Sequence, residues 1–470
     1  MRRDRASKLL LVTLGFAALM LFRERLWAYS LFTSAVLARP MSVLGCRAHV
    51  GELAERVAQL PLATRERCRA IYRVTVRESV MVISPSFAPK MVRWTIRDGQ
   101  SEADALQSAR RQTAVVVTEL VHGHEAHFNP LRASKPVAFK HAEGASPAFD
   151  EIASSAGPTC DFCSPAEQTG AESWGRIEGR SSLTAANAFR ADGVHGLLVF
   201  ARHDPLTITL DELADGLDVI ERWLRRSEAE ARTRAPASGA WWPLVWWNGL
   251  HRSSASQIHA HAQMVLSPTP PGRTSAYARA QAGYSSARGS DFFADLAAVH
   301  VGLGLGVRVG AAHVLASLTP HVPAGEILVV GDDGAPLGAL AAPLHVALRA
   351  LIDGHGCRSF SLVLQLPPID APRAAGDEPA AARARERAGP AGADEGAATT
   401  GARGKRIVAT LLDRGADLDA RTADVGGVDL VLGSTIANAD PFAIAEAIAL
   451  AAGLPLQCGA STPDAGADAR

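Results

Sequence analysis

The stretch from Asn248 to Gln263 concentrates side chains that could carry out a covalent reaction. It contains Gln-Ile-His-Ala-His-Ala-Gln-Met from Gln257 to Met264. If this segment is a β-strand, alternate residues share a face, so Gln257, His259, His261 and Gln263 project together while the apolar residues between them face a core. Two imidazoles and two amides on one face predict a reactive site. The alternative is a half-buried strand with one solvated face.

The residue types in this stretch indicate phosphorus chemistry. A neutral imidazole can attack phosphorus and form a covalent intermediate, which divides one difficult transfer into two easier steps. Such a histidine needs a neighbour that fixes its tautomer, and the phosphoryl oxygens need hydrogen-bond donors. Ser253, Ser254 and Ser256 precede the histidines, and Gln263 follows them. Together with nearby backbone N–H groups they predict a binding site for a phosphate-bearing substrate.

A Cys-x-x-Cys pair, Cys160 and Cys163, stands between Pro158 and Pro165. By itself the pair could be a redox dithiol, half of a zinc site or a chance occurrence. The other four cysteines are scattered and suggest no disulfide framework, and six cysteines in 470 residues fit a reducing compartment. Two thiolates would need two further ligands to close a tetrahedral zinc site.

The histidine segment resembles the active-site motif of the galactose-1-phosphate uridylyltransferases, within the wider histidine-triad superfamily. That motif has an Asn, a Gly/Ser-rich loop and then Ser-x-x-His-x-His-x-Gln, and Ser256, His259, His261 and Gln263 match it in register. The chain has Ala260 where the family usually has Pro, and Gly249 where it often has Lys. Neither departure removes a reacting group, but both bear on the sugar substrate.

The resemblance implies a role for each matching residue. His261 would be the nucleophile that carries the nucleoside monophosphate, and Ser256 and Gln263 would hold phosphoryl oxygens. His203 and His259 would complete a structural zinc site with the two cysteines. Substrate would be bound by four further residues: Asn187, Phe189, Asn248 and Ser254.

The same resemblance implies a fold and an activity. The expected fold is α+β, with two histidine-triad-like units in tandem and antiparallel sheets with packed helices. The expected enzyme is a nucleotidyltransferase of the UDP-glucose–hexose-1-phosphate uridylyltransferase type, which acts in galactose metabolism on a nucleotide sugar and a sugar 1-phosphate. Two alternatives stay open: a phosphorylase or adenylyltransferase of the same superfamily acting on a dinucleoside polyphosphate or GDP-sugar, and a non-catalytic, zinc-stabilised binding protein. A homodimer is also left open.

Net charge and the N-terminal sequence bear on two kinds of partner, nucleic acid and membrane. The chain has 48 basic and 48 acidic residues, and no basic patch indicates nucleic acid. Arg2, Arg3, Arg5 and Lys8 precede an apolar run at 9–22, which is shorter than the roughly 20 residues of a membrane-spanning helix. This pattern is similar to a signal peptide, but Arg23-Glu24-Arg25 follows without a clear cleavage site. We expect an N-terminal extension of a cytoplasmic enzyme, with a membrane anchor as the alternative.

The remaining elements are expected in the following order. Residues 1–40 form the extension and 41–150 an N-terminal region with strands at 74–83 and 91–96 and a helix at 101–120. Residues 151–268 form the first unit, with a strand at 196–200, a helix carrying Leu213, Leu217, Ile220 and Leu224, a strand at 244–247 and the histidine strand. Residues 269–460 form the second, non-catalytic unit, with strands at 326–330, 359–366 and 406–412, a helix at 344–352 and a last helix from Asp440 to about 452. Residues 371–405 are rich in Ala, Arg, Gly, Glu and Pro, which predicts a disordered insertion, and 461–470 form a tail.

Three further groups of residues have the composition of a functional site, but a structural role is expected for each. The glycine-rich segment 302–310 lacks the strand and acidic partner of a dinucleotide loop, so we expect a hairpin. His122, His124 and His127 are expected in a solvated turn. Trp241, Trp242, Trp246 and Trp247 are expected mainly in the core and at interfaces.

Overall fold

The computed structural model describes residues 48–96, 99–132, 160–235, 239–370, 406–415 and 427–455. The expectations for segments 1–40, 371–405 and 461–470 lie outside these residues.

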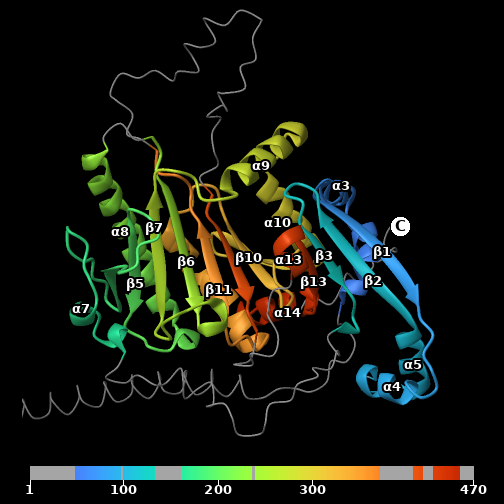
Figure 1. Cartoon of the computed structure of the whole chain (residues 1–470). Helices are drawn as coiled ribbons and strands as arrows, with labels where there is room; N and C mark the ends of the chain where they lie inside the picture. The colour runs from blue at the N-terminus through green and yellow to red at the C-terminus, as the bar shows by residue number, and fades with distance from the viewer. Residues whose placement is uncertain are drawn as a thin grey trace, which may run out of the picture. The chain divides into compact units, whose positions relative to one another are not determined.

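A nine-stranded antiparallel sheet forms the centre of the described structure (Figure 1). Each strand pairs antiparallel with its neighbours, and helices pack against the sheet, so the predicted α+β class with antiparallel sheets is confirmed. The strands, in spatial order, are β4 (Ser182–Ala186), β5 (His195–Phe200), β7 (His261–Ser267), β6 (Trp242–Gly249), β11 (Phe360–Gln365), β12 (Val408–Asp413), β10 (Glu326–Gly331), β9 (Ala312–Ala316) and β8 (Gly306–Val309).

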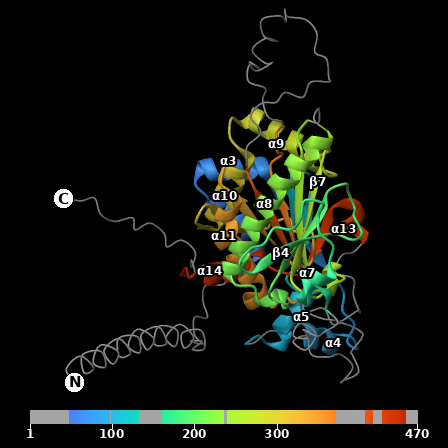
Figure 2. The same ribbon diagram turned by 90° about the vertical axis from the view of Figure 1, so that its left-hand side faces the viewer.

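Three helices cover one face of this sheet (Figures 1 and 2). They are α8 (Leu210–Arg234), α11 (Ala341–Arg349) and α14 (Pro441–Ala451). Thr209 and Glu212 form a capping box at the start of α8, and Asp440 caps α14 as expected. Alternate residues of β6, such as Val245 and Trp247, are buried on this side. The intervening residues, Trp246 among them, are half-buried on the other face.

The two halves of the sheet repeat one strand order. The first half runs β4-β5-β7-β6 and the second β9-β10-β12-β11, and the halves meet where β6 pairs with β11. In each half a helix (α8 or α11) joins the second strand to the third along the chain. The repeat expected from the sequence is therefore present as topology. The boundaries proposed for the units stay predictions, because one sheet runs through both.

The described strands of the second half have no His or Gln at the positions that match His261 and Gln263. When the strands are matched by their bounds and pairing registers, Val408 and Thr410 occupy the places of His261 and Gln263. Neither side chain is a nucleophile of the imidazole type, which fits one active and one structural half.

The N-terminal residues form a second, four-stranded sheet of order β1-β2-β3-β13. Its strands are β1 (Tyr72–Val80), β2 (Arg111–Glu119), β3 (Glu125–Phe128) and β13 (Ser434–Ala437), the last of which pairs parallel with β3. The strand predicted at 91–96 is wrong: these residues lie in helix α4 (Ala88–Thr95), because Pro89 favours a first helical turn and Met91 and Thr95 are buried one turn apart. The helix predicted at 101–120 is right only for α5 (Glu102–Arg110), since Val115, Val116 and Val117 are buried in strand β2.

The remaining elements connect these layers. They are η1 (Val50–Glu52), α2 (Leu53–Gln59), α3 (Leu62–Ile71), η3 (Asp161–Cys163), α7 (Pro165–Gln168), η4 (Pro205–Thr207), η5 (His251–Ser253), α9 (Thr274–Arg288), α10 (Phe292–Leu303), η6 (Leu337–Leu340), η7 (Ala350–Gly354) and α13 (Gly427–Leu432). Among the described helices, the continuous stretch Leu337–Gly354 has the length and apolar character to cross a membrane, and 56% of it is buried within the protein. Its packing against α8 and α14 accounts for that apolar character.

The structural roles expected for the glycine-rich segment and the tryptophans are confirmed, but the role expected for two of the histidines is wrong. The glycine-rich segment forms the β8–β9 hairpin, as expected. Trp241 and Trp247 are buried in the core, as expected. The solvated turn is wrong for His122 and His124, because His122 bonds to Glu119 and Gln281, and His124 bonds to Tyr277.

Candidate active site and metal centre

His261 begins β7 and is held as one tautomer. Its Nδ1 lies 2.8 Å from the carbonyl oxygen of His259. A carbonyl can only accept, so Nδ1 carries the proton and Nε2 keeps its lone pair. The side chain is 6% exposed, its ring lies edge-on to that of Phe162 at 5.0 Å, and burial lowers the pKa of His261 below its ordinary value. The result is a neutral, oriented imidazole whose Nε2 has no hydrogen-bond partner among the described residues.

The segment before His261 is a tight turn, so the strand predicted from residue 257 begins four residues late. Ser253 is 1% exposed and its hydroxyl donates to the carbonyl oxygens of Gly249 and Leu250. Leu250 and Ser254 both have a positive φ (69° and 68°), a backbone conformation that non-glycine residues seldom adopt. Ala260 is then tied to the end of β5 through hydrogen bonds with Phe200 and His203. The Phe200–Ala260 bond continues the register of β5 with β7, but the turn bonds and the positive φ angles interrupt a strand before residue 260, which a pattern of alternating residues does not reveal.

Gln263 lies on the same face of β7 as His261, since the two are separated by one residue. Its Oε1 is 3.0 Å from His195 Nε2 and 3.4 Å from Asn187 Nδ2. Asn187, expected at the nucleoside, therefore lies beside Gln263. His195, at the start of β5, was missed by the sequence reasoning, because a single His before an apolar strand carries no spacing signal.

The other expected substrate residues differ in their exposure. Ser254 and Ser256 are exposed on the turn before β7. The ring of Phe189 is 91% exposed, two residues from Asn187. Asn248 is half-buried near the end of β6 and pairs with Ser361 of β11. The structure thus gathers Asn187, Gln263 and His195 by hydrogen bonds, whereas Ser254, Ser256 and Phe189 are exposed and available to a ligand.

A Cys₂His₂ group brings together three segments that are distant in the sequence. The ligand atoms of Cys160, Cys163, His203 and His259 all lie within 4.8 Å of one another. His259 Nδ1 is 3.6 Å from each sulfur, His203 Nδ1 is 3.4 Å from Cys163 Sγ, and the two Nδ1 atoms are 3.1 Å apart. Ligands around a tetrahedral zinc at its usual bond lengths would be separated by roughly 3.3–3.8 Å. The group could therefore hold a metal with little rearrangement.

The protonation of the group also suits a metal. His259 Nε2 lies 2.6 Å from the carbonyl oxygen of Phe200, so Nε2 carries the proton and Nδ1 is free to coordinate. Burial, with the neighbouring His203 and His261, lowers the pKa of His259 to about 4. Burial and the adjacent Cys160 raise the pKa of Cys163 to about 11 in the metal-free protein. A bound cation would reverse that effect on the thiols, because coordination favours the thiolate.

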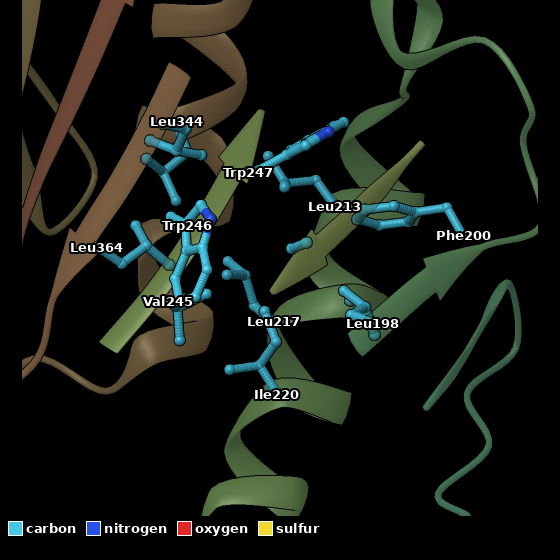
Figure 3. A pocket seen from close by; sticks show the side chains of 13 residues that line it. Leu198, Phe200, Leu213, Leu217, Ile220, Val245, Trp246, Trp247, Leu344 and Leu364 are labelled. Atoms are coloured by element: carbon cyan, nitrogen blue, oxygen red, sulfur yellow. The ribbon is translucent and has the colours of Figure 1, made fainter. Parts of the chain in front are cut away.

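A small cavity beside β7 is a gap in the core. It has a volume of about 20 Å³ and lies between the sheet and helices α8 and α11, lined by apolar residues that include Leu198, Leu217 and Leu344 (Figure 3). An apolar space of this size has at most room for one water molecule and no polar group to hold it. The candidate site is therefore on the opposite face of the sheet, where His261 and Gln263 project.

No family model matches the chain, and neither does any curated protein. Among solved structures, an ADP-glucose phosphorylase from Arabidopsis thaliana with bound ADP-glucose is 13% identical, with 71% of this chain and 97% of that chain covered and a TM-score of 0.49. A GalT-like protein from Arabidopsis thaliana is 14% identical (62% and 91% covered, TM-score 0.45), and a uridylyltransferase is 15% identical (72% and 98% covered, TM-score 0.43). At these identities the likeness concerns the fold.

Proposed function

We propose that this protein is a nucleotidyltransferase that works through a covalent nucleotidyl-His261 intermediate. The observation that carries the proposal is the tautomer of His261: the bond from Nδ1 to the His259 carbonyl leaves an unprotonated Nε2 on a neutral ring. Gln263 adds an amide two residues away on the same face, and Ser256 adds an exposed hydroxyl. Nucleophile and phosphate ligands thus occur together, as covalent phosphorus chemistry requires.

In the first half-reaction, Nε2 of His261 attacks the α-phosphorus of a nucleotide sugar. The new N–P bond forms as the bond from the α-phosphorus to the bridging oxygen breaks, and the sugar 1-phosphate leaves with that oxygen. The leaving group is already a phosphate, so it needs no strong general acid. Amide and hydroxyl donors from Gln263 and Ser256 would stabilise the charge on the phosphoryl oxygens.

In the second half-reaction, a phosphate oxygen of an acceptor attacks the same phosphorus and His261 leaves. Gln263 can donate a hydrogen bond but cannot shuttle a proton at neutral pH. Water is therefore a poor acceptor, which favours a transferase over a hydrolase. The acceptor we propose is a sugar 1-phosphate, as in a UDP-glucose–hexose-1-phosphate uridylyltransferase.

The metal we propose for the Cys₂His₂ group is a structural zinc. Zinc accepts two thiolates and two imidazoles in a closed tetrahedral site, which has no open position for substrate. Cys160, Cys163, His203 and His259 would hold it. Its contribution would be to fix His259, whose carbonyl oxygen in turn orients His261.

An exchange experiment tests the transfer. Labelled sugar 1-phosphate should enter the nucleotide-sugar pool with ping-pong kinetics in the wild-type protein, and His261→Gly should abolish this exchange because no carrier remains. Nucleotide sugar alone should give a stoichiometric burst of sugar 1-phosphate and little further turnover. Steady release of nucleoside monophosphate, unaffected by acceptor, would contradict the transferase reading.

A substrate panel separates the remaining alternatives. UDP-glucose, ADP-glucose, GDP-hexose and ATP should be offered as donors, with sugar 1-phosphate or inorganic phosphate as the acceptor. Turnover with inorganic phosphate but not with sugar 1-phosphate would identify a phosphorylase. Nucleotide binding without any transfer would identify a zinc-stabilised binding protein.

A further inference from the structure

His195 is a buried histidine next to the proposed site. It is 2% exposed, begins β5, and lies on the same face of the sheet as Gln263. Its ring is 5.6 Å from that of Trp246, which pairs with Gln263 from the other side. The side chain therefore has little freedom, and its hydrogen bonds are set by its surroundings.

The backbone fixes the tautomer of His195. The N–H of Ala191 donates to Nδ1 at 2.9 Å, so Nδ1 has no proton and Nε2 carries it. Burial lowers the pKa of His195, so the ring is neutral near pH 7. Nε2–H is thus a donor, and the acceptor in front of it is Oε1 of Gln263 at 3.0 Å.

Asn187 provides a second donor to the Gln263 side chain. The N–H of Phe189 donates to Asn187 Oδ1 at 2.8 Å, which turns Nδ2 toward His195 Nε2 at 3.1 Å and Gln263 Oε1 at 3.4 Å. Because Nε2 of His195 carries a proton, Oε1 is the acceptor for both donors. Two donors with fixed orientations therefore meet one atom of the Gln263 amide. That atom must be the carbonyl oxygen, because an amide nitrogen there would face two further donors.

We propose that His195 is a positioning residue that holds the Gln263 carbonyl and thereby presents the Gln263 N–H groups to the phosphoryl group. This inference rests on the proposed function for the identity of the substrate, but the orientation of Gln263 rests on the hydrogen bonds alone. A glutamine without this anchor could rotate by half a turn and direct its carbonyl lone pairs at the phosphoryl oxygens. The rotated side chain would repel the phosphoryl oxygens, and it would no longer offer a donor where negative charge develops in the transition state.

Two conservative variants separate positioning from packing. In His195→Asn the side-chain oxygen can take the place of Nδ1 and accept the hydrogen bond from the Ala191 N–H. The shorter side chain has no donor that reaches Oε1 of Gln263. In His195→Gln the longer amide can replace Nε2–H and keep the donor to Gln263. We expect kcat for exchange to fall about 10²-fold in His195→Asn and to recover to within about tenfold of wild type in His195→Gln. Zinc content and melting temperature should be similar in the two variants.

A double-mutant cycle provides the second readout. Once Gln263→Ala has removed the amide, His195→Asn should lower kcat little further, because its effect passes through Gln263. Full additivity of the two losses, or a His195→Gln variant as slow as His195→Asn, would overturn the proposal.

The tautomer can be measured whether or not the protein catalyses transfer. Nitrogen-15 NMR of histidine-labelled protein, with the His195→Gln variant for assignment, should show His195 protonated at Nε2 only. A His195 protonated at Nδ1 would overturn the proposal even in an active enzyme. An inactive wild-type protein with the Nε2–H tautomer would contradict the proposed function and leave the anchored orientation of Gln263 supported.

Discussion

Replacing Ser359 with Ala should loosen the turn that leads from β6 into the catalytic strand. Ser359 is fully buried, immediately before β11. Its hydroxyl donates to the Gly249 carbonyl at 2.8 Å and accepts from the Ser253 N–H at 3.1 Å. One side chain therefore ties both ends of the 249–253 turn to the second half of the sheet.

The expected loss of stability follows from the two hydrogen bonds that the substitution removes. Both hydrogen bonds disappear, and the buried Ser253 N–H keeps only its longer bond, at 3.3 Å, to the Leu250 carbonyl. Each lost hydrogen bond contributes about 0.5–1.5 kcal/mol, so the free energy of unfolding should fall by about 2 kcal/mol. Exchange between nucleotide sugar and sugar 1-phosphate should slow as well, because the turn carries Ser254 and Ser256 to the site.

Ser227→Ala is the matched control. Ser227 lies on α8, is also 1% exposed, and its hydroxyl has no hydrogen-bond partner. Removing that hydroxyl should leave stability unchanged or raise it, because an unpaired buried polar group is lost. Urea unfolding of the two variants compares the effects directly. Equal stability of Ser359→Ala and Ser227→Ala would refute the reasoning that the hydrogen bonds of Ser359 hold the turn.

Three further predictions concern the metal, the core and the pH dependence of stability. The purified protein should carry about one zinc per chain, and Cys160→Ser with Cys163→Ser should lose it with a lower melting temperature; full activity without metal would contradict this. Gly249→Ala should destabilise the protein by about 1–3 kcal/mol through overpacking, because an added Cβ would lie 2.4 Å from the Phe360 ring; the Phe360→Leu background should reduce that cost, and an unchanged cost there would argue against the clash. Burial lowers the pKa of His300 to about 4, so the unfolded chain binds more protons and stability should fall as pH drops from about 6.5 toward 4. Between pH 7 and pH 5, protonation of His300 in the unfolded chain should lower the free energy of unfolding by about 2 kcal/mol. Urea unfolding of His300→Leu at several pH values should show a smaller loss of stability over this range. A loss equal to that of the wild-type protein would contradict the prediction.

The positions of several strands and the grouping of the Cys₂His₂ residues could be predicted, whereas the local geometry of the site could not. Apolar patterning located β5, β10, β11 and β12 because these strands are buried on at least one face. The resemblance placed Cys160, Cys163, His203 and His259 in one group, and the structure brings their ligand atoms together. Apolar patterning sufficed for the strands, but the Cys₂His₂ group needed the resemblance, because the Cys-x-x-Cys pair alone did not identify its partners.

Other features depend on contacts that no local pattern contains. The turn before His261 is held by Ser359, more than a hundred residues away, so its effect on the start of β7 could not be anticipated. His195 became visible only when the Ala191 N–H and Gln263 were placed around it. His124 was misjudged because its partner Tyr277 lies on α9, in the other half of the chain. In each case a long-range hydrogen bond decides the local structure.

The most direct test of the central claim is the mass of the protein after reaction with substrate. Brief incubation with a nucleotide sugar, without acceptor, should add one nucleoside monophosphate per chain. The added group should be acid-labile, as an N–P bond requires, and should map to the peptide that contains His261. Addition of sugar 1-phosphate should return the protein to its original mass and release nucleotide sugar. An unchanged mass during active transfer, or a label on a residue other than His261, would contradict the account.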